Sequence, residues 1–153
     1  VEMAHNFHRD YEQGRDKLSP VLRGLIERGR KHLAVDYTRA VAAINPLNEA
    51  LESVFDEYDA ILTPATPSAA FALGERSGDP VSMYLNDIFT VTANLVGLPA
   101  LALPAGLDQH GLPLGLQVIG KALDEDSVFA VSASLEKAAN FRAKAAKWWA
   151  GGT

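Results

Sequence analysis

The chain has 153 residues, a formal net charge of -5 at pH 7 and 48% hydrophobic residues, and it contains no cysteine. These values describe a globular domain rather than a disordered chain, and they exclude disulfides, a thiolate nucleophile and cysteine-ligated zinc. The acidic balance argues against a large nucleic-acid-binding surface, because phosphate binding needs clustered positive charge.

The sequence shows no candidate for a membrane anchor. The longest apolar stretch, residues 88–107, is interrupted by Gly97, Pro99 and Pro104, whereas a spanning helix needs about 18 or more uninterrupted apolar residues. No basic and apolar leader follows Val1. We therefore expect no contact with a membrane and a cytoplasmic location.

Residues 1–57 are predicted to be helical, because apolar residues recur there at spacings of three and four among many charges. Ser19 followed by Pro20 is typical of a helix N-cap and first turn. Asp36 is predicted to cap a longer helix. Pro46 lies inside that pattern and should kink the helix or divide it into two.

Charged residues become scarce in the next part of the chain. Between Asp59 and Gly120 the charged residues after Asp59 are Glu75, Arg76, Asp79, Asp87 and Asp108. A segment so poor in charge is expected to form the buried centre of the chain, and a polar group inside it needs a partner or a ligand.

This part and the C-terminal end are predicted to alternate between strands and helices. The expected elements are a buried strand at 60–63, a surface connection over 65–83, a helix over 84–95 closed by Gly97, strands at 100–104 and 114–120 joined by a turn with Asp108 and Gly111, and a last helix from Asp124 to about Lys144. The order predicts an α/β fold with a helical N-terminal segment.

Four polar residues stand out inside the apolar part. Asp87, Thr90 and Asn94 recur at helical spacing and would form one polar line. Gln117 places an amide inside the strand LGLQVIG. Each of them either satisfies neighbouring backbone groups or faces a cleft.

Other constellations carry weaker signals. His5 and His8 stand one helical turn apart but have no evident third ligand, and the SxxK spacing of Ser134 and Lys137 lacks the partner motifs of acyl enzymes. We expect no metal site and no cofactor. A set of basic residues near the C-terminus is expected to be the solvated end of the last helix: Lys137, Arg142, Lys144 and Lys147.

Three motifs in a fixed order carry a family resemblance: YDAILTPATP, YLNDIFTVTANLVGLPALALPAG and GLPLGLQVIGKALDEDSVFAVSASLE. Over residues 58–139 they resemble the C-terminal third of the amidase signature family, while residues 1–57 match it only in helical style. The motif YLNDIFT is most similar to the A subunit of aspartyl/glutamyl-tRNA amidotransferases. The resemblance implies the C-terminal part of the amidase signature fold, a mixed sheet covered by helices.

The resemblance also implies where the chemistry lies. Family members hydrolyse amides with a serine nucleophile, a second serine in a cis peptide and a lysine, all in a signature upstream of these motifs. None of the serines here lies in a GGSSGGS setting, so we expect no catalytic residue in this chain, and no activity from it alone. By its motif position Asp87 would hold the amino group of the donor glutamine, with Thr90, Asn94 and Gln117 as pocket-wall candidates.

The resemblance implies an organisation and a set of partners. Residues 1–57 would be a helical segment, 58–147 the core and 148–153 a tail, together one structural unit of a longer enzyme. The expected partners are a small amide such as glutamine, the B and C subunits of an amidotransferase with tRNA, and a second copy of the fragment at an open sheet edge. A general amidase and an amidotransferase subunit both remain open, and so does a non-catalytic packing or partner-binding module.

Overall fold

The computed structural model describes residues 1–76 and 78–142, and these fall into two compact units. The first unit comprises Val1–Leu47 and the second begins at Asn48. Each unit has its own cluster of buried side chains.

The first unit is helical, as predicted. It consists of α1 (Glu2–Asn6), α2 (His8–Gly14), the 3-10 turn η1 (Arg15–Lys17), α3 (Pro20–Gly29), α4 (Ala34–Ala42) and the start of α5 (Ile44–Glu52). Ala4, Tyr11 and Ile26 form its core, and Ile26 is fully buried. The Tyr11 hydroxyl donates a hydrogen bond of 2.8 Å to Glu27.

Local signals placed some of these helix ends. Ser19 is the N-cap of α3 and accepts a bond from the Leu22 N–H at 3.2 Å, which confirms the prediction. The prediction for Asp36 is wrong: Leu33 is the N-cap of α4 and Asp36 lies inside its first turn. The division into two helices is confirmed, because Pro46 cannot donate to the carbonyl of Ala42 and its ring crowds that group.

The second unit combines three strands with helices. After α5 its elements are the 3-10 turn η2 (Ser53–Asp56), β1 (Ile61–Pro64), α6 (Pro80–Tyr84), the 3-10 turn η3 (Leu85–Asp87), α7 (Thr90–Val96), β2 (Ala100–Leu107), β3 (Pro113–Ile119) and α8 (Glu125–Ala139). The strands form an antiparallel sheet in the order β1-β3-β2. The α/β class is therefore confirmed, and all pairs among the described strands are antiparallel.

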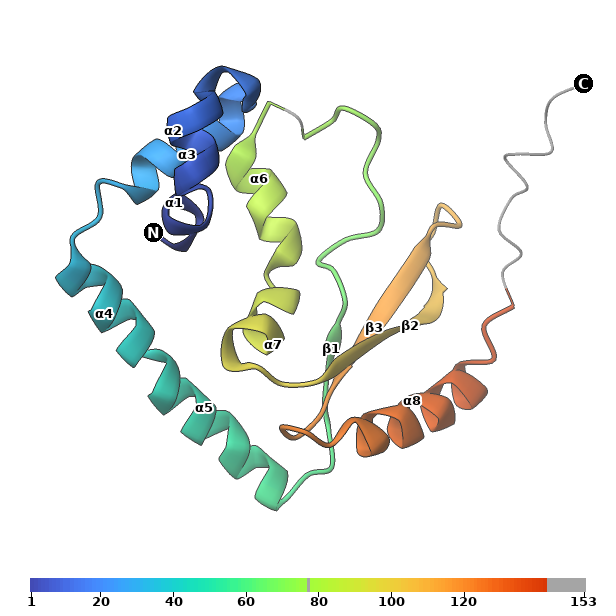
Figure 1. The fold of residues 1–153 in the computed structure, drawn as a ribbon. Coiled ribbons are helices and arrows are strands. Elements are labelled where there is room, and N and C mark those ends of the chain that lie inside the picture. The colour runs from blue at the N-terminus through green and yellow to red at the C-terminus, as the bar shows by residue number, and fades with distance from the viewer. Residues whose placement is uncertain (77, 143–153) are drawn as a thin grey trace, which may run out of the picture. The chain divides into compact units, whose positions relative to one another are not determined.

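The register assigns the side chains of the sheet to two faces. Leu62, Val118 and Leu101 are paired neighbours on one face, and Val118 packs with Leu103 and with Val128 of α8. Figure 1 shows α8 running along this side of the strands. The alternate residues of β1 and β3 point to the opposite face, beneath α7.

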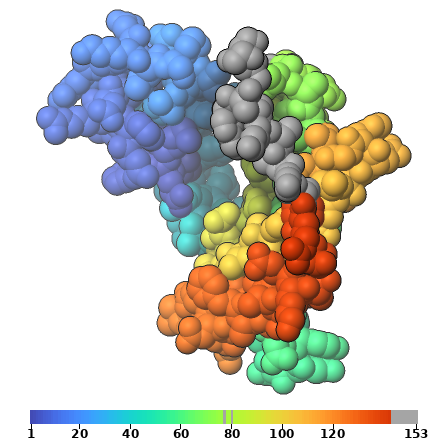
Figure 2. Space-filling view, turned by 90° about the vertical axis from the view of Figure 1, so that its right-hand side faces the viewer, coloured from blue at the N-terminus to red at the C-terminus, as the bar shows by residue number. Residues whose placement is uncertain are grey.

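The hairpin between β2 and β3 forms as predicted, and its outer end projects beyond α8 in Figure 2. Asp108 and Gly111 lie in the connection, and Gly111 has a positive φ of 80°. Gly97, with a φ of 71°, ends α7 in the left-handed conformation, which confirms its predicted role.

Several predicted boundaries are wrong. The strand at 60–63 is not buried, because it lies at an edge of the sheet and Leu62 is 50% exposed. The connection predicted over 65–83 ends earlier, at α6, where the Asp79 carboxylate caps the first turn. The last helix ends at Ala139, followed by Asn140 in the left-handed conformation; Lys144 and Lys147 lie outside the described residues.

The charge-poor segment is only partly buried. It supplies the central strand β3, but several of its large apolar side chains are 47–54% exposed: Leu62, Leu85, Ile88, Val91 and Leu95. Three strands with one helix on each face are too few to cover every apolar side chain that the segment contains.

Candidate functional site

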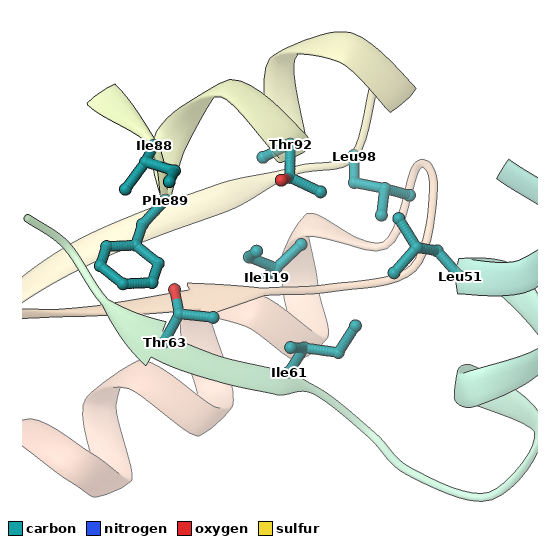
Figure 3. A pocket seen from close by; sticks show the side chains of 9 residues that line it. Leu51, Ile61, Thr63, Ile88, Phe89, Thr92, Leu98 and Ile119 are labelled. Atoms are coloured by element: carbon teal, nitrogen blue, oxygen red, sulfur yellow. The ribbon is translucent and has the colours of Figure 1, made fainter. Parts of the chain in front are cut away.

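A cavity of about 110 Å³ lies between α7 and the sheet (Figure 3). Its lining is mostly apolar and consists of Leu51, Ile61, Thr63, Ile88, Phe89, Thr92, Ala93, Leu98 and Ile119. The two threonines supply its polar side chains. The cavity therefore suits an apolar group and offers neither a nucleophile paired with a base nor a charged side chain.

Asp87 lies just before this region, as the last residue of η3. Its side chain is exposed and does not line the cavity. Within residues 1–76 and 78–142, no group hydrogen-bonds or pairs with its carboxylate. The carboxylate is therefore available to an external cation or ammonium group.

Thr90 and Asn94 follow Asp87 along the same segment but are already engaged with the backbone. The Thr90 hydroxyl donates to the Asp87 carbonyl at 3.1 Å, and the Asn94 amide donates to the Thr90 carbonyl at 3.0 Å. These two side chains brace their own helix. The structure places these two residues on the segment that follows Asp87, and neither of them lines the cavity between α7 and the sheet.

Gln117 reaches the same segment from β3. It is 4% exposed, and its Nε2 donates to the Phe89 carbonyl at 2.9 Å and to the Thr63 hydroxyl at 3.0 Å. A carbonyl oxygen can only accept, so the amide nitrogen must face Phe89. Both hydrogens of that nitrogen are thus used within the fold.

A second contact on this segment involves Arg76, which the sequence did not single out. Its guanidinium donates to the Asn86 side-chain oxygen and lies 4.4 Å from the centre of the Phe71 ring. The Asn86 amide donates in turn to the Ser82 carbonyl at 3.2 Å. The residue before Asp87 is therefore hydrogen-bonded to the preceding connection.

Two hydrogen-bond partners of Gln117 were also missed: Thr63 and the carbonyl of Phe89. Thr63 lies two residues after Ile61 in β1, so the period of the strand could have placed its hydroxyl on the same face as Ile61. The Phe89 carbonyl gives no sequence signal, because every residue carries the same group.

The weaker constellations do not assemble into sites. His8 lies 3.1 Å from Arg30 through its Nδ1, and the Ser134 hydroxyl donates to the Ala130 carbonyl of its own helix. In the part of the chain that the structure describes, no three histidine or acidic side chains gather as a metal site. Likewise, none of the described helices is long and apolar enough to span a membrane.

Comparison with known proteins gives consistent matches. Residues 3–129 match the family model described as Amidase. The A subunit of the glutamyl-tRNA(Gln) amidotransferase of Maricaulis maris is 56% identical over 114 residues, which cover 74% of this chain and 23% of the relative.

Solved structures agree with these matches. The A subunit of the glutamyl-tRNA(Gln) amidotransferase of Thermotoga maritima aligns at 35% identity and a TM-score of 0.64, covering 84% of this chain and 30% of that one. A crystal structure of an amidase aligns at 27% identity and a TM-score of 0.77, covering 88% and 32%.

The family match extends the resemblance toward the N-terminus. Residues 1–57 resemble the family in more than helical style, because the match begins at residue 3. The chain spans only about a quarter of the length of the relatives it matches. The match over residues 3–129 and the shared fold show that this chain belongs to the amidase signature family.

Proposed function

We propose that the whole protein cleaves the C–N bond of an amide as the A subunit of a glutamine-dependent tRNA amidotransferase. The observation that carries this proposal is the 56% identity over 114 residues to the A subunit of a glutamyl-tRNA(Gln) amidotransferase. The catalytic serine pair and lysine would lie upstream of the present residues, which supply part of the substrate pocket. No metal or organic cofactor is part of the proposal.

Asp87 is the proposed substrate contact in this chain. Its exposed carboxylate is free among the described residues, and a carboxylate beside a substrate ammonium forms a charge-assisted hydrogen bond. An upstream serine would attack the amide carbonyl and form an acyl enzyme while ammonia leaves. Water would then hydrolyse the acyl enzyme and release the acid, while the ammonia would pass to a coupled acceptor. Thr90 and Asn94 would support the segment that carries Asp87.

A general amidase is the second candidate. The structural match to the crystal structure of an amidase has the higher TM-score, 0.77 against 0.64 for the Thermotoga maritima protein. In that case the released ammonia or amine would go to solvent and no partner subunit would be needed. A non-catalytic module is the third outcome, and it requires that the gene encode no lysine and serine-rich signature.

The proposal includes partners and a location. The substrate would be a small amide, with glutamine as the first candidate, and the partners would be B and C subunits with tRNA in the cytoplasm. We also propose that the isolated chain associates with a second copy of itself, because β1 and β2 are both edge strands of the described sheet and can pair with further strands.

An activity assay of the full-length protein separates the candidates. An amidotransferase subunit should hydrolyse glutamine, and its activity should rise when partner subunits and charged tRNA are added. Hydrolysis of simple aromatic or aliphatic amides without any activity on glutamine would contradict the amidotransferase proposal and favour the general amidase.

Asp87→Ala tests the proposed substrate contact. Loss of a charge-assisted hydrogen bond should raise KM for an amide with an α-amino group by roughly 10-fold to 100-fold, with little change in Tm because the side chain is exposed. Asp87→Asn, which keeps the shape but not the charge, should behave similarly. A lowered Tm with unchanged kinetics would make Asp87 a structural brace.

A further inference from the structure

Gln117 connects the central strand of the sheet to the segment that carries Asp87. β3 pairs with both β1 and β2, so it is held on both sides. From this strand the Gln117 amide crosses to the Phe89 carbonyl, 28 residues earlier in the chain. Gln117 is 4% exposed, so this part-buried hydrogen bond ties a segment outside the sheet to a strand that is paired on both sides.

The anchored carbonyl lies where the expected helix is interrupted. Residues 88 and 89 form a turn between η3 and α7, although neither is glycine or proline. A side chain that binds a main-chain carbonyl is one of the recognised causes of such a break. The break leaves Asp87 in η3, outside α7.

Asp87 is thus flanked by two hydrogen-bonded residues. Arg76 binds Asn86, immediately before Asp87, and Gln117 binds the backbone of Phe89, two residues after it. The carboxylate itself remains exposed and unpaired within the described part of the chain. This arrangement holds the backbone of a charged group while leaving its side chain free to bind.

We propose that Gln117 is a positioning residue, which fixes the carboxylate of Asp87 for the substrate amino group through its bond to Phe89. The inference rests on the proposed function of Asp87. Gln117 does not donate to the substrate itself, because both hydrogens of its amide nitrogen are used by Phe89 and Thr63.

A double-mutant cycle in the full-length protein tests whether Gln117 acts through Asp87. Gln117→Met keeps a similar length but removes the donor, and it should raise KM for an α-amino amide by roughly 3-fold to 10-fold. In the Asp87→Ala background the same substitution should change KM by less than about 2-fold, since the positioned group is gone. Fully additive effects would overturn the proposal.

Thr63→Val is the matched control. It removes the other partner of the Gln117 amide but leaves the bond to Phe89, so KM should change by less than about 2-fold. A loss equal to that of Gln117→Met would overturn the assignment of the effect to Phe89. If Gln117→Met does not fold, Gln117→Asn serves in the same cycle, because its shorter side chain cannot span the same distance.

Amide hydrogen exchange separates the positioning proposal from the proposed function. Exchange in the peptide covering residues 85–96 should be faster in Gln117→Met than in Thr63→Val. Unchanged exchange would overturn the positioning role, even if Asp87→Ala raises KM. A different result is faster exchange in Gln117→Met together with normal kinetics of Asp87→Ala. It would overturn the proposed role of Asp87 in substrate binding, and with it the effect of Gln117 on that binding.

Discussion

Asp108 stabilises the turn between β2 and β3 through its side chain. Its Oδ1 accepts hydrogen bonds from the backbone N–H groups of His110 and Leu112, both at 2.8 Å. The hydrogen bond from the Leu112 N–H is the main cause that holds the pKa of the Asp108 carboxyl below its ordinary value of 3.8, and the bond from the His110 N–H lowers this pKa further. The ionised form is therefore favoured by folding.

The sign of this shift gives a pH dependence. Because the pKa is lower in the folded state, the stabilisation by Asp108 is fully present above pH 3.8 and is lost as the pH falls through the pKa of the folded state. Asp108→Asn should be less stable than the parent protein at pH 7, and the difference in urea midpoint should narrow below pH 3.8.

Comparing Asp108→Ala with Asp108→Asn separates the effect of the negative charge from that of the side-chain oxygen that accepts the hydrogen bonds. The alanine variant loses both, so its midpoint at pH 7 should lie below that of Asp108→Asn, whose amide oxygen still accepts. A gap between the parent protein and Asp108→Asn that stays constant down to about pH 3 would show that the ionised carboxylate is not favoured in the folded protein.

At the scale of elements, the contact between β3 and α8 depends on a glycine. A Cβ atom at Gly120 would lie 2.3 Å from Cγ2 of Val128, which is 3% exposed and cannot move aside easily. Gly120→Ala should therefore lower the free energy of unfolding by about 1–3 kcal/mol through overpacking. Thermal or urea unfolding measures this loss.

Two further variants make the test of Gly120 specific. Gly106→Ala is the control, because its Cβ would meet nothing within 4 Å. Val128→Ala removes the conflicting methyl group, so Gly120→Ala should cost much less in that background. Equal stability of Gly120→Ala and Gly106→Ala would contradict the close approach of α8.

The elements that the sequence predicted correctly are those with local signals. Ser19 with Pro20 marks a helix start, Gly97 marks a helix end, and the residues around Asp108 mark a hairpin turn. The interruption of the expected helix at residue 88 was missed, because Gln117, whose side chain binds the Phe89 carbonyl there, lies 28 residues from Phe89 in sequence. Periodicity reports only on neighbours along the chain.

In the candidate site, the sequence likewise predicted what local signals indicate and missed what depends on distant residues. Asp87 and Gln117 are predicted as candidates because they are polar residues in an apolar stretch, and the amidase resemblance assigned Asp87 its proposed role. Their arrangement could not be predicted, because it depends on the register that places Gln117 opposite Thr63 and on a backbone carbonyl. The sequence therefore predicted candidate residues but not which of them bind the backbone.

At the scale of the whole chain, the two units have separate cores. Ala4, Tyr11 and Ile26 form one core, and Val118 lies in the other. The fully buried side chains of the described residues include one from each, Ile26 and Val118. This division predicts that damage to one core affects mainly its own unit.

Ile26→Ala and Val118→Ala test that division as a matched pair. Ile26→Ala should cost about 2–5 kcal/mol in local stability, through lost burial and the cavity left behind. Hydrogen exchange should accelerate in α1, α2 and α3 while β3 and α8 keep their protection, and Val118→Ala should give the reverse pattern. Equal acceleration in both units from either substitution would show that they unfold as one cooperative body, in which case the separate cores have no separate stability.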